Sequence, residues 1–416
     1  MRQLHPRSAA AAIVIVAALV GTGHARAGDI DQMRLAAHQL ASAERPSGLL
    51  DFDYDFLAGD AIGSGRTDIE KTAFIAREAD AAYALAKYLA WSKDPSVTAT
   101  VRRLIATFGS LSMPVGKSSV QRGLETLHIL SLPVGRYKLH ELLEAQGLLY
   151  QPKGAGKLVA YEGSYKTAWA GATALALLAE LEYLRATDDN QFAALRASWV
   201  DGLRVLHIPG RGFREYPGSI EETPYANGET WLALATYAAL FPKDERLSAL
   251  LSSYDDYVIE KYSAEPELQF YSWGTMAAVQ RLATTSDAKF AAFIAAQTRH
   301  FLGQEVPTAQ QDQNSCAFVE GLAAAAAALA KRGGQPELVQ QLTSRIDHEM
   351  TRNRALQIAP GLTELDFPSG ASVRSTHLVD YAGAYLAGAG ALYVRIDVTA
   401  HCLSALVEMQ GIAANR

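Results

Sequence analysis

The hydrophobic positions of this chain recur with a helical period, and they fall into two kinds of segment. One kind is apolar nearly all the way round and rich in alanine and leucine, as in YKTAWAGATALALLAELEYLRA over 165–186. The other kind has one polar face, as in FAALRASWVDGLRVL over 192–206. Short stretches rich in Gly, Pro, Asp and Ser separate the segments, so the pattern predicts pairs of helices joined by loops.

The alanine-rich segments recur along the chain, and their arrangement predicts an all-α fold. They lie at 72–91, 165–186, 227–240, 272–283, 315–332 and 394–409, and amphipathic partners follow at 192–206, 245–262 and 287–301. A spacing of roughly 45 to 60 residues is typical of helical-hairpin repeats. A helix that is apolar all round is buried on both sides, whereas a helix with a polar face lies outside. We therefore expect an (α/α) toroid of six or seven helical hairpins, with a small-residue inner ring and an amphipathic outer ring.

The stretch from 108 to 160 is less regular than the rest. We expect helices there at about 117–131 and 137–147. Almost no alternating β-branched segment competes with the helical pattern elsewhere in the chain.

The first 27 residues have the pattern of a secretory signal. Arg2 and Arg7 precede the apolar run SAAAAIVIVAALVG, and the sequence ARA at 25–27 fits the small-residue cleavage rule. The run is shorter than the roughly 20 apolar residues that span a bilayer comfortably. We expect residues 1–27 to be removed and residues 28–416 to form one toroid domain that is periplasmic or secreted, without a stable membrane span. The alternative is an uncleaved membrane anchor.

The amino-acid composition limits the possible binding partners but does not indicate a reaction. Nearly half of the residues are apolar, and the net charge of −6 comes from interspersed acids and bases, so nothing favours nucleic acid or an anionic membrane as a partner. The two cysteines, Cys316 and Cys402, form one disulfide in an oxidising compartment or remain two small buried side chains. The sequence sets no oligomeric state.

At this point the chain resembles bacterial (α/α) toroid proteins, the architecture shared by six-hairpin glycosidases, glucuronyl epimerases and terpenoid cyclases. The resemblance covers most of residues 70–410 and is carried by FIAREADAAYALA, YKTAWAGATALALLAELEYLRAT, YANGETWLALATYAALFPKDE, FYSWGTMAAVQRLA, FVEGLAAAAAAL and VRIDVTAHCLSALV. Many proteins of this style have Pro-Gly-Glu where this chain has Asn227, Gly228 and Glu229. The resemblance implies the architecture but no single reaction, because the fold hosts hydrolases, lyases, epimerases and cyclases.

In such a ring the inner helices run the same way, so their first residues meet at one mouth, where a pocket usually lies. A charged side chain there is buried at a cost of several kcal/mol unless it is paired. The alternative interpretation is that these groups pair with one another and cap the helices. The residues near these helix starts that we expect to bind substrate are Arg77, Lys166, Trp169, Tyr225, Trp231, Tyr271, Trp273, Arg395 and His401.

Three carboxylates are the candidates for catalysis. Glu229 and Glu320 each interrupt an apolar inner helix near its start without an opposite charge three or four residues away, and Asp397 is the third. A buried acid of this kind has a raised pKa and can act as a general acid. The block 210–229 reads as a loop lining the mouth, and Asp51, Asp53 and Asp55 read as a solvated turn or as a segment folded over it.

Sharper motifs are absent or incomplete, so no cofactor and no metal are expected. The phosphate-loop-like GKS at 116–118 has Leu111 where a glycine is required, and His140 has Glu144 where a metalloprotease has its second histidine. No G-x-S-x-G elbow occurs. Asp255 and Asp256 faintly resemble a diphosphate-binding pair, but they lie on an outer, amphipathic helix.

Paired carboxylates and aromatic rings favour carbohydrate chemistry, because glycoside hydrolysis needs two acids and rings stack on sugar faces. We therefore expect an exported protein that acts on or binds a saccharide or cell-envelope polymer, possessing the architecture of a glycoside hydrolase, lyase or epimerase. The alternative is a non-catalytic binding or scaffold protein in an exported polysaccharide or envelope assembly.

Overall fold

Six alanine-rich helices form the inner layer of the computed structural model, which describes residues 27–50, 53–57, 59, 68–115, 127–135, 137–139, 156–161, 167–303, 313–367, 370 and 372–414. The inner helices are α3 (Asp68–Ser92), α7 (Ala170–Thr187), α9 (Pro224–Leu240), α11 (Leu268–Thr285), α13 (Cys316–Arg332) and α15 (Ile396–Ala414). Each packs against the next along the chain, and α15 packs against α3, so the inner ring is closed.

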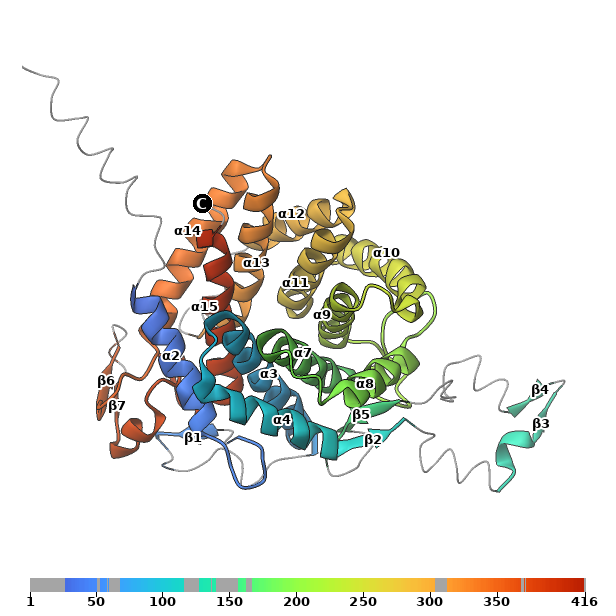
Figure 1. The fold of residues 1–416 in the computed structure, drawn as a ribbon, viewed down its shortest axis with the longest axis horizontal. Coiled ribbons are helices and arrows are strands. Elements are labelled where there is room, and N and C mark those ends of the chain that lie inside the picture. The colour runs from blue at the N-terminus through green and yellow to red at the C-terminus, as the bar shows by residue number, and fades with distance from the viewer. Residues whose placement is uncertain are drawn as a thin grey trace, which may run out of the picture.

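Six more helices surround this ring among the described residues (Figure 1). The outer helices are α2 (Ala27–Ser42), α4 (Thr98–Leu111), α8 (Ala193–Leu206), α10 (Ser248–Ala264), α12 (Ala288–Leu302) and α14 (Pro336–Arg354). Five of them follow their inner partner in the sequence. The sixth, α2, precedes the first inner helix and packs on the last one, α15, so the two ends of the chain complete one hairpin. The predicted toroid of six hairpins is confirmed.

Local chemistry explains several helix boundaries. The N-cap residue of α9 is Thr223, whose hydroxyl accepts a hydrogen bond from the backbone N–H of Ala226, and Pro224 occupies the first turn. Asp287 caps α12 in the same way through the N–H of Lys289. At the end of α7, Asp188 adopts the left-handed conformation that closes many helices.

Small residues let neighbouring inner helices approach closely. A Cβ atom at Gly228 of α9 would lie 2.7 Å from Cβ of Trp273 in α11, and one at Gly321 of α13 would lie 2.9 Å from Cα of Ser272. A larger side chain would not fit at these contacts, which explains why glycine occupies them.

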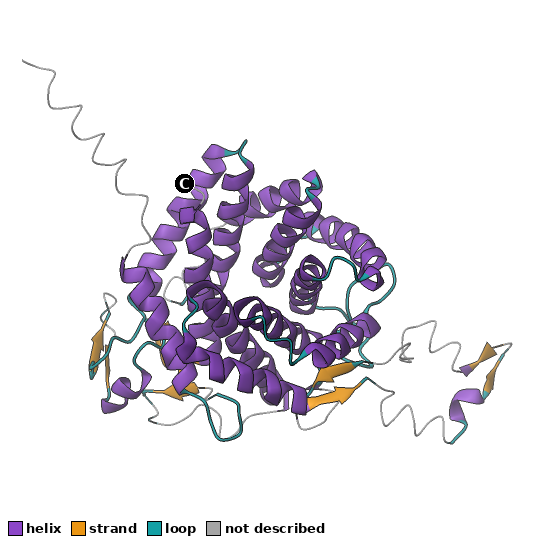
Figure 2. Cartoon of the chain, in the orientation of Figure 1, coloured by secondary structure: helices purple, strands orange, loops and turns teal. Residues whose placement is uncertain are grey.

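Short antiparallel strands lie at the margins of the helical body (Figure 2). One three-stranded sheet has the order β1-β9-β8, with Tyr54 opposite Val394. Three two-stranded sheets pair β2 with β5, β3 with β4 and β6 with β7. The strands are β1 (Asp53–Asp55), β2 (Ser112–Pro114), β3 (Pro133–Val134), β4 (Tyr137–Lys138), β5 (Lys157–Val159), β6 (Glu364–Asp366), β7 (Ser372–Arg374), β8 (Leu386–Gly388) and β9 (Ala391–Arg395).

Two local predictions need correction. Residues 127–139, expected to be helical at both ends, contain the short 3-10 turn Ile129–Ser131 and the β3–β4 hairpin, with Gly135 in the left-handed conformation between the strands. The remainder of the two helices expected at 117–131 and 137–147 lies outside the described residues. The last inner helix begins at Ile396 rather than 394, because residues up to Arg395 pair with β1 as a strand.

The two cysteines form a disulfide, which resolves the alternative that the sequence leaves open. Cys316 at the start of α13 is bonded to Cys402 in α15, with 4.8 Å between their Cα atoms. The bond joins two adjacent members of the inner ring. Among the described helices, none is both long enough and apolar enough to cross a membrane.

Candidate functional site

A cavity of about 600 Å³ lies at the end of the ring where the inner helices begin. All six inner helices contribute to its lining, mostly from their first three turns. Its polar and aromatic lining residues are Arg77, Asp80, Trp169, Glu215, Thr223, Tyr225, Glu229, Trp273, Gln313, Asn314, Tyr393, Arg395, Asp397 and His401. The convergence of helix starts on one mouth, expected from the sequence, is present.

Non-helical segments complete the wall of the cavity. The loop before α9 contributes Glu215 and Thr223, in agreement with the expectation that 210–229 lines the mouth. On another side, β9 presents Tyr393 and Arg395, while β8 contributes Ala387. Because β1 pairs with β9 along its length, Asp53 and Asp55 belong to the sheet whose strand β9 lines the cavity, but neither aspartate lines it. Asp51 lies outside the described residues.

The floor of the cavity holds a histidine between two acids. The Nδ1 atom of His401 lies 3.0 Å from Oε2 of Glu320, and its Nε2 atom lies 3.5 Å from Oδ2 of Asp80. Burial lowers the pKa of His401, but the negative charges of Asp80 and Glu320 raise it to about 10. The imidazole is therefore positively charged at neutral pH.

Glu229 is a carboxyl group that lines the cavity without a paired partner among the described residues. Its residue is 8% exposed, and among the described residues it has no hydrogen-bonding or ion-paired partner. Burial raises the pKa of Glu229 to about 8, and the nearby charge of Asp80 contributes in the same direction. Glycine at position 171 leaves room for this position of the side chain, since a Cβ atom there would lie 1.9 Å from Oε2 of Glu229 and the carboxyl group would have to move.

Asp80 lines the cavity one helical turn after Arg77. Burial raises the pKa of Asp80 to about 7, with the positive charge of His401 acting against this rise. Asp80 therefore loses its proton at a lower pH than Glu229, and between pH 7 and pH 8 it is the more ionised of these two carboxyl groups.

Asp397 is bound by two arginines at the mouth. Arg395 donates to it from Nε at 2.7 Å and from Nη2 at 2.8 Å, and Nε of Arg77 lies 3.3 Å from Oδ2. This bidentate arrangement matches the pairing that the sequence left as an alternative for charged groups at the mouth. Asp397 lines the cavity, but its oxygens already accept strong hydrogen bonds.

Most of the residues predicted to bind substrate line the cavity. Among them, those that line the cavity are Arg77, Trp169, Tyr225, Trp273, Arg395 and His401. Lys166 lies outside the described residues. Trp231 and Tyr271 do not line the cavity, contrary to the prediction, because each stands two residues from a lining residue and a step of two residues turns a helix by roughly 200°.

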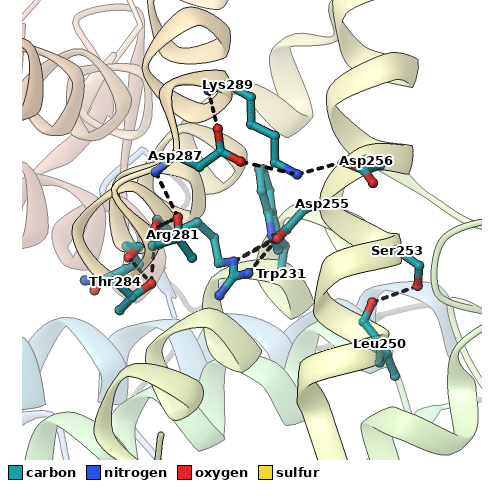
Figure 3. Close-up of polar contacts among 11 residues, drawn as sticks. Trp231, Leu250, Ser253, Asp255, Asp256, Arg281, Thr284, Asp287 and Lys289 are labelled. Atoms are coloured by element: carbon teal, nitrogen blue, oxygen red, sulfur yellow. Dashed lines mark hydrogen bonds and ion pairs between the residues drawn. The ribbon is translucent and has the colours of Figure 1, made fainter.

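The environment of Trp231 is typical of a structural residue (Figure 3). Its indole N–H donates to Oδ1 of Asp255 at 2.8 Å, and Arg281 binds the same carboxylate. Tyr271 is likewise fully buried and packs against Phe301 and Phe318. Asp255 thus lies in a seam, by which we mean the contact between an inner and an outer helix. Asp256 pairs with Lys289 between two outer helices.

Glu320 also needs correction as a candidate catalytic residue. It is completely buried behind His401 and does not line the cavity. Asp80, by contrast, lines the cavity but was not among the predicted residues. The signal that identifies it is the spacing: Asp80 follows Arg77 by three residues, which places the two side chains on the same face of the helix.

The described residues contain no group of three or more His, Cys, Asp or Glu side chains arranged to hold a metal ion. The acids and bases of the cavity are instead arranged as pairs and as the Glu320–His401–Asp80 line. These side chains can transfer protons and form hydrogen bonds, and a carboxylate among them can also act as a nucleophile.

Comparison with known proteins identifies the fold. No protein-family model and no curated protein sequence matches the chain. One similar solved structure is an inactive variant, with two aspartates replaced by alanine, of the α-1,6-mannanase GH76A of Salegentibacter sp. HEL1_6 in complex with α-1,6-mannotetrose. It has a TM-score of 0.56 and 10% identity over 93% of this chain and 99% of that chain.

A second similar structure is the GH76A α-1,6-mannanase from the same organism, with a TM-score of 0.54 and 8% identity over the same shares of the two chains. The two neighbours have the (α/α)6 toroid fold of a glycoside hydrolase, so the architecture that the sequence resemblance implied is present in this protein. At these low identities, the likeness is one of fold.

Proposed function

We propose that this protein is an exported glycoside hydrolase of a saccharide or cell-envelope polymer, with Glu229 as general acid and Asp80 as the ionised carboxylate. The observation that carries the proposal is the joint presence, in one cavity with aromatic walls, of Glu229 without a paired partner and Asp80 beside the imidazole of His401. The pKa of Asp80 is the lower of the two, so Asp80 ionises first. Glycosidases need such a pair to protonate the leaving oxygen and to supply a base or a nucleophile.

The proposed chemistry follows from the state of each acid. Glu229 donates its proton to the glycosidic oxygen as the bond to the anomeric carbon breaks. In one route, water forms the new bond to the anomeric carbon and Asp80 accepts its proton. In the other route, Asp80 itself bonds to the anomeric carbon, and water then cleaves this ester as the deprotonated Glu229 accepts the proton of the water. Trp169, Tyr225 and Trp273 offer ring faces and edges for the sugar, and Arg77 and Arg395 border the same space.

The fold neighbours suggest the first substrates to test. One of them is an α-1,6-mannanase in complex with α-1,6-mannotetrose, so α-1,6-linked mannan belongs in the first panel. The inactive variant of that neighbour has two aspartates replaced by alanine. This chain has consecutive aspartates at 188–189 and at 255–256, and neither pair lines the cavity. The proposed acids come instead from α3 and α9, and the panel should therefore include other envelope polysaccharides.

Export is part of the proposal and rests on the N-terminal sequence pattern. Expression of the full chain in a bacterial host, followed by fractionation and N-terminal sequencing, tests it. We expect the mature chain to begin at Gly28 in the periplasm or the medium. A product that keeps residues 1–27 and sediments with membranes supports the uncleaved anchor instead.

The decisive experiment compares the wild type with Glu229→Gln and Asp80→Asn on the polysaccharide panel. Loss of a general acid or base lowers kcat by roughly 10²- to 10⁴-fold, and we expect each variant to fall within this range while still binding the polymer. Unchanged turnover in either variant contradicts its assignment. A wild type that binds a polymer but never cleaves it supports the non-catalytic binding protein.

The pH dependence of kcat/KM gives a second test. Below about 7, Asp80 is protonated and loses its function as base, and above about 8, Glu229 has lost the proton that it must donate. The profile should be bell-shaped with its maximum between these values. A rate that rises steadily toward pH 5 contradicts the assignment.

A further inference from the structure

His401 connects two buried acids that come from different inner helices. Asp80 lies on α3 and Glu320 on α13, and both helices pack against α15, which carries His401. The three side chains form a line from the core to the cavity. Glu320 is fully buried at its inner end, and Asp80 lines the cavity at its outer end.

The two acids depend on His401 for charge compensation. Among the described residues, His401 is the ion-paired partner of both. The positive charge of Lys87 also acts on Asp80, but Lys87 is bound to Glu408 at 2.6 Å and to Ser404 at 2.8 Å. With a neutral imidazole, two buried carboxylates would therefore lack a counter-charge, which is unfavourable by several kcal/mol.

The remaining groups around His401 do not replace this charge. Asp397 of the same helix is bound by Arg395 and Arg77, and Glu229 faces the site from α9. From α11, the ring of Trp273 lies 6.1 Å from the imidazole, centroid to centroid. The titratable groups that surround His401 are thus Asp80, Glu229, Glu320 and Asp397, and all four are acids.

We propose that Glu320, His401 and Asp80 form a carboxylate–imidazolium–carboxylate relay, in which His401 is a positioning residue whose positive charge favours the ionised form of Asp80. The catalytic consequence rests on the proposed function, whereas the charge state of the relay does not. A buried carboxylate that orients an imidazole and stabilises its cation is a known arrangement in hydrolases.

The geometry gives the two ends of the relay different tasks. The short contact of 3.0 Å between Nδ1 and Glu320 fixes the orientation of the ring from the buried side. The longer separation of 3.5 Å between Nε2 and Asp80 leaves the other oxygen of Asp80 available on the cavity side. His401 thus acts on a ligand through Asp80.

The disulfide holds the relay in place. Cys402 follows His401 directly, and Cys316 precedes Glu320 by one helical turn, so the bond joins α13 to α15 beside the Glu320–His401 contact. Asn314, which lines the cavity, donates to Sγ of Cys402 at 3.1 Å. A rotation of α15 relative to α13 would separate the acid from the imidazole, and the disulfide opposes it.

The first test measures the charge of the relay without any substrate. The side-chain nitrogens of His401 in the full-length protein are followed by NMR from pH 5 to pH 9, with the signal assigned by its loss in His401→Gln. We expect an imidazolium through pH 8 and a lower titration midpoint in Glu320→Gln. His207 is the matched internal control, because burial without a neighbouring acid lowers its pKa. A neutral His401 at pH 7 overturns the proposal.

The second test measures the effect on Asp80. In His401→Gln, the loss of the positive charge should move the acidic limb of the kcat/KM profile upward by about one to three pH units, since an opposite charge at this distance shifts a carboxyl pKa by that amount. Added imidazole should restore part of the activity of His401→Ala. An unshifted acidic limb in a folded His401→Gln variant overturns the proposal.

The two failures are distinguishable. If no substrate is cleaved by the wild type, the proposed function fails, but the NMR titration still decides whether the relay exists. If His401→Gln does not fold, Glu320→Gln still tests the relay from the buried end, because Glu320 raises the pKa of His401. We expect a lower His401 midpoint in the NMR titration of this variant, and an unchanged midpoint contradicts the relay.

Discussion

Two sets of buried carboxylates in this molecule differ in their partners. In the seams between helices, Glu180 is bound by Arg196 at 2.5 Å and Asp255 by Arg281 at 2.7 Å. In the cavity, Glu229 has no such partner within the described residues, and Asp80 shares His401 with Glu320. Burial is similar in both sets, so burial alone does not mark a functional acid.

The difference follows from what surrounds each set. Each of these two acids faces an arginine with a side-chain exposure of 6% (Arg196) or 13% (Arg281), and the pair joins an inner helix to an outer one. Trp231 adds to this at Asp255 (Figure 3). A cavity acid faces open space at the helix starts, where its charge can respond to a ligand. The comparison predicts that seam variants lose stability and cavity variants lose activity.

Breaking a seam pair should have the largest effect on stability. Arg196→Ala leaves the fully buried carboxyl of Glu180 without its partner, which is expected to lower the free energy of unfolding by about 3–5 kcal/mol. Urea unfolding measures it. Arg34→Ala, which breaks an exposed pair with Asp31, is the control and should cost less than about 1 kcal/mol. If Arg196→Ala is as stable as the control, the seam acids are not structural.

Removing the disulfide should have the next largest effect. The double change of Cys316→Ala and Cys402→Ala opens a closed loop with a sequence separation of 86, and such bonds contribute about 2–4 kcal/mol. We expect this loss in the free energy of unfolding, together with a weaker Glu320–His401 contact in the NMR titration. A loss of stability without any change in His401 would separate the disulfide from the relay.

A glycine variant tests the cavity side without changing a charge. In Gly171→Ala, the new Cβ atom would lie 1.9 Å from Oε2 of Glu229 and must displace the carboxyl group. We expect kcat to fall by roughly 10- to 100-fold, since a displacement of about 1 Å has effects of this order. Gly411→Ala on α15 is the matched control, because its Cβ atom would meet Ala327 at an ordinary 3.6 Å. Equal activity of the two variants contradicts the placement of Glu229.

The smallest expected effect is a change in the pH dependence of stability. The pKa of Glu229 is about 8 in the folded chain against an ordinary 4.5, so the folded state holds this proton more tightly. Its contribution is complete below pH 4.5 and is lost as the pH rises through 8. In Glu229→Gln, the decline of unfolding free energy over this window should shrink by at least about 1.4 kcal/mol, the value of one pKa unit.

The pair of Asp244 and Arg246 is a control, because its effect on stability changes with pH in the opposite direction. Hydrogen bonds from Arg246 hold the pKa of Asp244 well below its ordinary value, so its contribution is present at neutral pH and is lost as the pH falls. Asp244→Asn should therefore flatten the acidic side of the stability curve. For Glu229 itself, identical curves of unfolding free energy against pH for the wild type and Glu229→Gln, between pH 4.5 and pH 8, would show that burial does not raise its pKa.

The sequence by itself determined the architecture, because helical period and side-chain size are local properties. The segments at 72–91 and 165–186 are apolar on all sides, and a helix of this kind must be buried on all sides. The pairing of each with an amphipathic segment then predicts a double ring. The strands escaped prediction because β1 and β9 are short and pair across 342 residues, Asp53 with Arg395, and only the closed ring brings them together.

Only the tertiary structure decided which of the buried acids and rings face the cavity. Glu229 and Trp231 are two residues apart and point in opposite directions, but the sequence does not tell which one faces inward. The junction of Asp80, His401 and Glu320 spans three helices. Its distances depend on how closely small residues let those helices approach, and this is a property of the packed ring rather than of any one segment.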